Sequence, residues 1–142
     1  MLAGGWQLEA AIQKRLPSGV TYAGNLNREE IRKMYQNSDW LVHPSNFEGF
    51  SLSILEALGA GLPVVASTAT GAADLGFSES VILFEPENLE QFVAALTKAK
   101  KLSRSKIQYQ TIEVASRFSW AKYRSGVSRV INSQGSIKSV YG

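Results

Sequence analysis

The chain alternates between short apolar runs and longer segments in which apolar residues recur at helical spacing. Two of the short runs, Val64 to Ala66 and Val81 to Phe84, contain no alternating polar residues. Strands of this kind are usually buried on both faces, as the strands of parallel sheets are. Two further runs, Val20 to Ala23 and Trp40 to Val42, also read as strands. Strands that alternate with helices predict an α/β fold with a parallel sheet flanked by helices.

Two helix starts are predicted by capping residues. Asn27 and Glu30 fit a capping box, in which an N-cap side chain and an acid three residues later bond each other's backbone. Asn88 fits an N-cap in the same way. The apolar faces expected for these two helices consist of Ile31, Met34 and Tyr35, and of Leu89, Phe92, Val93 and Leu96.

Four more helices are expected from spacing and from helix breakers. Pro17-Ser18-Gly19 ends the first of them, and Gly61 followed by Pro63 ends the second. The expected ranges are Leu8 to Leu16, Leu52 to Ala60, about Lys106 to Phe118, and Ala121 to Ile131.

Length and composition limit the chain to one globular domain. A chain of 142 residues with 44% hydrophobic residues can bury a single core. We expect that domain over residues 1–133 and a flexible tail over residues 134–142.

Charge and cysteine content exclude several classes of function. The net charge of +3 falls short of the basic surface that nucleic acids need, so we expect no nucleic-acid partner. The densest positive stretch, Lys98 to Lys106, falls at a junction of two predicted helices, where cations favour the negative helix end. The absence of cysteine excludes disulfides, thiolate metal sites and a cysteine nucleophile. Without a signal peptide or an apolar run of about 20 residues, a cytoplasmic location is expected.

Ligands of open parallel sheets bind beyond the carboxyl ends of the strands. Three loops occupy such positions, at residues 24–27, 45–51 and 67–73. The loop at 45–51 leaves a strand, turns at Gly49 and enters a helix whose first free amides belong to about Phe50 to Ser53. Amides at a helix start, together with the positive dipole end, attract phosphate, so this loop is expected to hold a diphosphate.

Two carboxylates flank that helix start, Glu48 in the loop and Glu56 in the helix, with seven residues between them. A carboxylate accepts two hydroxyl donors at once, which suits the paired hydroxyls of a ribose or a hexose. Two structural alternatives stay open. Ser53 and Glu56 also match a capping box, and Glu48 also fits a solvated loop acid near a helix start.

Residues 43–66, HPSNFEGFSLSILEALGAGLPVVA, closely resemble the signature of the family-four retaining glycosyltransferases, which have the GT-B architecture of two Rossmann-like domains facing a cleft. That signature contains a Glu, seven residues, a second Glu and then an Ala-x-x-x-Gly-x-Pro-Val-Val-Ala run. The likeness continues at Gly4-Gly5, at Tyr22 to Leu26 and at Phe118-Ser119-Trp120. It implies a partial C-terminal nucleotide-sugar-binding domain with a Rossmann-like sheet.

The resemblance also implies roles for individual residues. Glu48 would act at the catalytic centre by binding the donor sugar, and Glu56 would hold the ribose. Asn25 and Leu26 would line the nucleobase pocket. Backbone amides of the helix start would contact sugar and diphosphate oxygens, from Gly49, Phe50, Ser51 and Leu52. No metal and no cofactor are implied, because in this family cationic side chains and the helix start do what magnesium does elsewhere.

The chain also departs from the family pattern. The family's domain begins with a central strand and a helix that carry an Arg and a Lys for the diphosphate, whereas Met1-Leu2-Ala3 looks like the end of its second strand. We therefore expect an N-terminally truncated domain that lacks its first strand and the acceptor-binding domain. Such a chain is expected to be poorly stable, rearranged or completed by another polypeptide, and inactive alone. Asp74 stands where the family more often has Glu.

The parent enzyme implied by the resemblance transfers a sugar from a nucleoside diphosphate sugar to an acceptor with retention of configuration. Membrane contact is expected only through the absent domain. The alternative is a non-catalytic remnant or subunit completed by a partner chain; a GT-B-like epimerase fits the Glu pair less well. The base, the sugar and the acceptor depend on pocket shape and are not predicted.

The remaining candidate residues favour structural roles. His43 is the only histidine and comes directly before Pro44 at a strand end, a family position without a catalytic role. The three tryptophans are expected to pack in the core or at a domain seam rather than to stack on sugar. Gly71-Ala72-Ala73 fits either a close approach to the donor or a plain tight turn.

Overall fold

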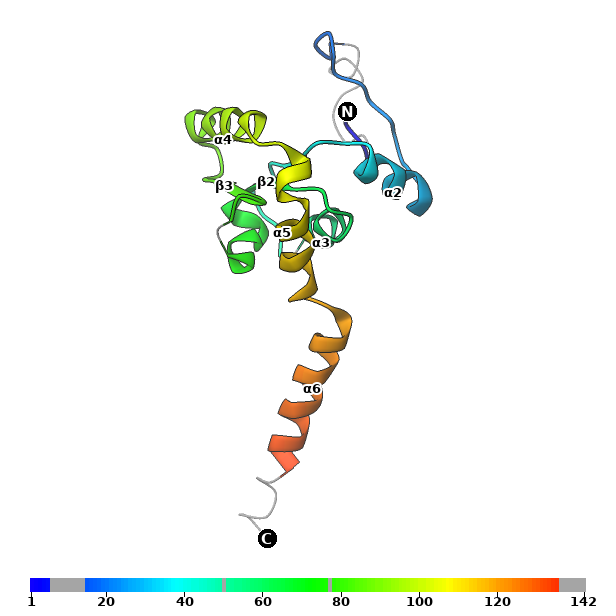
Figure 1. Cartoon of the computed structure of the whole chain (residues 1–142), viewed down its shortest axis with the longest axis vertical. Coiled ribbons are helices and arrows are strands. Elements are labelled where there is room, and N and C mark those ends of the chain that lie inside the picture. Colours follow the sequence, from blue (N-terminus) through cyan, green and yellow to red (C-terminus); the bar gives the residue numbers. More distant parts are fainter. Residues whose placement is uncertain (6–14, 50, 77, 136–142) are drawn as a thin grey trace. The chain divides into compact units, whose positions relative to one another are not determined.

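A three-stranded parallel sheet forms the centre of the larger part of the structure, a computed structural model that describes residues 1–5, 15–49, 51–76 and 78–135 (Figure 1). Its strands are β1 (Leu41–His43), β2 (Val64–Ser67) and β3 (Val81–Phe84), in the order β1-β2-β3. The register pairs Val42 with Val65 and Val65 with Ile82. The predicted α/β fold with a Rossmann-like parallel sheet is confirmed.

The structure divides into two units, residues 1–37 and residues 38–142. Each unit is described by itself. Most of the helix expected from Leu8 to Leu16, and Trp6 with it, lies outside the described residues. Residues 136–142 of the expected tail also lie outside them.

Burial differs between the strands in a way that the sequence pattern anticipated only in part. All four residues of β2 are buried, and three of the four in β3 are buried as well. In β1, by contrast, Val42 is exposed and its two neighbours are half-buried. Within the part of the chain that the structure describes, β1 pairs with β2 alone and lies at an edge of the sheet.

The described residues of the second unit form four α-helices and two short 3-10 helices. They are α3 (Leu52–Gly59), α4 (Leu89–Lys101), α5 (Arg104–Ser116) and α6 (Trp120–Gly135), with η1 (Thr68–Thr70) and η2 (Ala72–Leu75) between β2 and β3. Helix α3 contacts β1, β2 and α5, and α4 contacts β2 and β3. Each α-helix lies in a segment where the sequence predicted one, with bounds that differ by a few residues.

The face that α4 buries differs from the predicted one. Leu89 and Val93 were expected in the core but are 72% and 53% exposed. The buried residues are Ala95 and Ala99, and Phe92 and Leu96 pack partly against the same cluster of Val65, Ile82 and Phe84. The face of α4 that packs on the sheet therefore has the predicted spacing but begins three residues later, at Phe92 instead of Leu89. The small alanine side chains on this face let the helix backbone approach the sheet closely.

The first unit contains one described helix, α2 (Arg28–Gln36), and one isolated bridge. The predicted capping box is confirmed: Asn27 Oδ1 accepts from the Glu30 amide at 3.0 Å, and Glu30 Oε2 accepts from the Asn27 amide at 2.7 Å. The predicted strand from Val20 to Ala23 is reduced to one parallel bridge between Leu2 and Tyr22. That bridge supports the interpretation of residues 1–3 as the end of a strand.

No helix within the described ranges combines the length and the apolar character that crossing a membrane requires.

Candidate functional site

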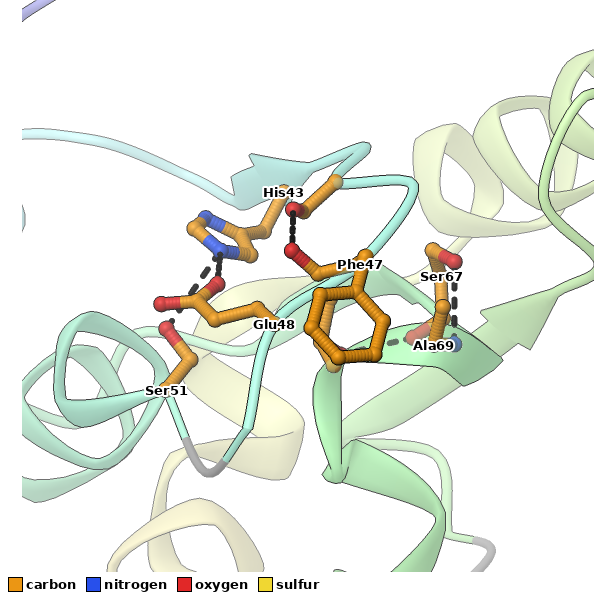
Figure 2. A network of polar contacts seen from close by, with 8 residues as sticks. His43, Phe47, Glu48, Ser51, Ser67 and Ala69 are labelled. Atoms are coloured by element: carbon orange, nitrogen blue, oxygen red, sulfur yellow. Dashed lines mark hydrogen bonds and ion pairs between the residues drawn. The ribbon is translucent and has the colours of Figure 1, made fainter.

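Loops that follow the three strands are tied together at the carboxyl edge of the sheet. The Glu48 amide donates to the carbonyl oxygen of Ala69 at 3.0 Å, which joins the loop after β1 to the loop after β2 (Figure 2). Thr68 Oγ1 donates to Glu85 Oε2 at 3.1 Å, which joins the loop after β2 to the loop after β3. The cross-links hold the loop at 45–51 in place at the edge where a ligand was expected.

The Glu48 side chain is held by His43, the last residue of β1. His43 Nε2 and Glu48 Oε2 lie 2.5 Å apart, with side chains that are 24% and 37% exposed. A carboxylate only accepts hydrogen bonds, so we assign the hydrogen of this contact to Nε2. Within the described residues the second oxygen, Oε1, has no hydrogen-bond partner and is left to accept from a ligand.

Ser51 connects this pair to the start of α3. Ser51 is the N-cap of that helix and is only 2% exposed. Its hydroxyl lies 3.3 Å from His43 Nε2 and makes no capping hydrogen bond to the helix amides. The first amides of a helix have no partner within the helix, so those of α3 keep their capacity to bind an anion.

Glu56 lies within α3 and does not belong to a capping box. The helix begins at Leu52 with Ser51 as its N-cap, so Ser53 is already helical and cannot cap. The capping alternative for Glu56 is therefore wrong, because the helix starts two residues earlier than that pattern requires. The Glu56 side chain is exposed and has no partner among the described residues. It is available to a ligand.

The other predicted site residues fall into three groups. Gly49 is exposed in the turn, and Leu52 is 61% exposed at the helix start. Phe50 lies outside the described residues. Asn25 and Leu26 belong to the first unit, on the loop before α2, where Asn25 is exposed and Leu26 is half-buried. Their part in a common site with Glu48 stays a prediction.

A largely apolar pocket of about 630 Å³ lies beside the start of α3. Its lining consists of Leu52, Leu55, Arg117, Phe118, Ser119, Trp120, Lys122 and Tyr123. Trp120 is 67% exposed and meets the Tyr123 ring edge-on, so it does not pack in the core; packing at a domain seam, the other expectation, stays a prediction. Trp40 does pack partly against the core, as expected.

The described residues hold no cluster of three or more His, Asp or Glu side chains that would suit a metal ion. The groups that the structure describes here are two carboxylates, an imidazole, a hydroxyl and the amides of a helix start. Together these groups can bind hydroxyls and a phosphate.

Sequence reasoning missed the contact between His43 and Glu48. His43 was expected to play a structural role, and its proximity to Glu48 was not foreseen. The sequence feature that could have indicated this contact is the short separation of the two residues: His43 ends β1, and Glu48 lies five positions later in the loop that follows. A loop of that length brings its ends together only when it turns back sharply, as this one does.

Comparison with known proteins places the chain in a family. Residues 3–116 match the family described as Glycosyl transferases group 1. The chain is 32% identical over 121 residues to the sulfoquinovosyl transferase SQD2 of Arabidopsis thaliana, covering 81% of this chain and 23% of that protein. It is 36% identical over 64 residues to a GDP-mannose-dependent alpha-mannosyltransferase of Corynebacterium glutamicum, covering 45% of this chain and 15% of that protein.

A third relative is the O-antigen chain mannosyltransferase B of Escherichia coli, which is 28% identical over 95 residues, covering 66% of this chain and 24% of that protein. The chain thus spans a quarter or less of the length of these relatives. Because the family match extends over most of the chain, including the loop of Glu48 and helix α3, the chain belongs to the glycosyl transferases group 1 family.

Proposed function

We propose that this chain binds the donor, a nucleoside diphosphate sugar, for an enzyme that transfers the sugar to an acceptor with retention of configuration. In this reaction the bond between the anomeric carbon and the diphosphate oxygen breaks. A bond forms between the same carbon and an acceptor hydroxyl oxygen, whose proton is released. The transition state carries positive charge on the sugar ring and negative charge on the departing diphosphate.

The observation that carries the proposal is the position of Glu48 beside the start of α3. The carboxylate offers Oε1 to sugar hydroxyls, while the helix start offers amides and a positive dipole end to the diphosphate. Glu56, exposed on the same helix, would accept hydrogen bonds from the ribose hydroxyls. Developing negative charge on the diphosphate is the charge that such a helix start stabilises.

Donor binding is tested by titrating the isotopically labelled 142-residue chain with GDP and with GDP-mannose and recording amide chemical shifts. GDP-mannose is the donor in the name of one relative, and UDP with UDP-glucose serves as a second pair. We expect the largest shift changes from Glu48 to Ser53, with no change at Thr97 and Lys98 in α4. A folded sample in which the amides of Glu48 to Ser53 do not respond to any of these ligands would contradict the proposal.

A further inference from the structure

We infer that His43 is a positioning residue, which orients the Glu48 carboxylate for the donor sugar before the donor arrives. The inference rests on the proposed function and adds to it a residue that sets how well the sugar is recognised. It is carried by the shared contact of one imidazole nitrogen with two side chains of the site, Glu48 and Ser51.

The first step concerns the freedom of Glu48. Its side chain projects from a loop and is 37% exposed, so without a partner the carboxylate would sample several rotamers. The hydrogen bond from Nε2 to Oε2, 2.5 Å long, selects one of them. Oε1 then has a fixed direction, and hydroxyl binding no longer has to order the side chain.

The second step concerns the rigidity of His43 itself. It is the last residue of β1, and its backbone is fixed because His43 pairs with Ala66 in the buried strand β2. A group on a strand is held more precisely than a group on a loop. The imidazole, whose position is fixed by the sheet, therefore restricts the movement of a carboxylate that is on a loop (Figure 2).

The third step concerns Ser51. Its buried hydroxyl is 3.3 Å from the same Nε2 and makes no cap to the helix. The imidazole thus lies between the carboxylate that would bind the sugar and the residue that begins the diphosphate-binding helix. Removing the imidazole should disturb the sugar contact through Glu48, while the backbone of the helix start stays in place.

The test compares two dissociation constants for each variant, that of GDP-mannose and that of GDP, measured by calorimetry on the 142-residue chain. The UDP and UDP-glucose pair is used instead if the wild type binds it more tightly. For His43→Ala we expect GDP-mannose to bind roughly five- to tenfold more weakly and GDP to change less than twofold. His43→Gln, whose side-chain amide can still donate to Oε2, should recover most of the loss.

Two further variants complete the design. Glu48→Ala should weaken GDP-mannose selectively, and adding His43→Ala to it should have no further effect, because the carboxylate that His43 orients is already removed. Thr97→Ala, in α4 and outside the site, removes an exposed hydroxyl that donates to the Val93 carbonyl and should leave both constants unchanged.

The outcomes separate the inference from the proposed function. If the wild type binds neither nucleotide pair, the proposed function fails and the inference fails with it. If the wild type binds but His43→Ala weakens GDP and GDP-mannose equally, or weakens neither, the positioning role is wrong while donor binding stands. Additive losses in the His43→Ala, Glu48→Ala double variant would also overturn it. Thermal unfolding of each variant, expected within a few degrees of wild type, identifies a loss that comes from misfolding.

Discussion

The Nε atom of Arg104 donates a hydrogen bond of 3.1 Å to the carbonyl oxygen of Gly61, directly beyond the end of α3. Two other nitrogens of the same guanidinium donate to the carbonyl oxygens of Ala60 at 3.2 Å and Ser38 at 2.5 Å. The last carbonyls of a helix have no partner within it. Arg104, from the start of α5, therefore satisfies the end of the helix whose other end forms the candidate site.

Replacing Arg104 should lower the free energy of unfolding without altering the candidate site. We expect Arg104→Ala to reduce the free energy of unfolding by about 1–3 kcal/mol, because it removes charge-assisted hydrogen bonds to partly buried carbonyls. Arg104→Lys should recover less than half of this loss, since an ammonium cannot reproduce the planar fork. Lys106→Ala, an exposed cation in the same helix turn, should change the value by less than about 0.5 kcal/mol. Urea denaturation measures all three, and equal losses for Arg104→Ala and Lys106→Ala would contradict this role.

Gly61 should not tolerate a side chain. Its φ is +72°, and a Cβ there would lie 2.8 Å from the Gln108 side chain. We expect Gly61→Ala to cost about 1–2 kcal/mol from the left-handed backbone alone. The double variant Gly61→Ala, Gln108→Ala should keep most of that cost, because it relieves the contact and leaves φ unchanged.

Gly59 provides the matched control for Gly61. It is the last residue of α3, and a Cβ there would have no heavy atom within 4 Å. Gly59→Ala should therefore be neutral or stabilising by up to about 1 kcal/mol, because alanine favours the helix. Thermal unfolding of both variants measures the difference, and a destabilising Gly59→Ala would argue against the helix end described here.

A buried pair of hydroxyls joins α5 to the residue before β3. Thr111 and Ser80 are both fully buried, and their oxygens lie 3.0 Å apart. Thr111 also lies 2.9 Å from the Ile107 carbonyl, and since its hydroxyl has one hydrogen, donation to Ile107 leaves it to accept from Ser80.

Thr111→Val should cost about 1–3 kcal/mol of unfolding free energy, because it leaves the Ser80 hydroxyl buried without a partner. Thr111→Ser keeps the hydroxyl and loses one methyl group, so it should cost about 1 kcal/mol. In the Ser80→Ala background, Thr111→Val should cost less than in the wild type. Chemical denaturation of the wild type, Thr111→Val, Ser80→Ala and their double variant forms a double-mutant cycle. A coupling energy of zero would rule out the hydrogen bond between the two hydroxyls.

The features that the sequence predicted correctly depend on neighbours along the chain. The caps at Asn27 and Asn88 join residues two or three positions apart, so local rules identify them. The buried runs of β2 and β3 are apolar on both faces, which only a covered strand tolerates. Once these strands were predicted, the rule that ligands bind beyond the carboxyl ends of parallel strands gave the position of the candidate site.

The features that were missed depend on contacts between distant segments. Two faces of α4 fit the same helical spacing. Only packing against the sheet, where Ala95 and Ala99 approach closely, determines which of the two is buried. In the sequence, Arg104 cannot be distinguished from the other cations of its basic stretch, because its partners lie more than 40 positions away. The contact of His43 with Glu48 depends on the path of a loop, which no periodicity describes.

Glu56 gives a prediction that separates ribose recognition from sugar recognition. If Glu56 holds the ribose, Glu56→Gln should weaken GDP and GDP-mannose by the same factor, roughly tenfold, because both ligands carry the ribose. The ratio of the two constants should stay at its wild-type value, in contrast to the result expected for His43→Ala. Since Glu56 is exposed and has no partner among the described residues, the free energy of unfolding should change by less than about 0.5 kcal/mol.

The control for Glu56 is Glu90→Gln, which also removes an exposed acid from the early part of a helix, α4. It should alter neither dissociation constant. Calorimetry with both nucleotides measures the effect of each variant on binding, and denaturation measures its effect on stability. Unchanged binding of both nucleotides in Glu56→Gln would make Glu56 a solvated residue of α3, and the ribose would then have to be recognised by other groups.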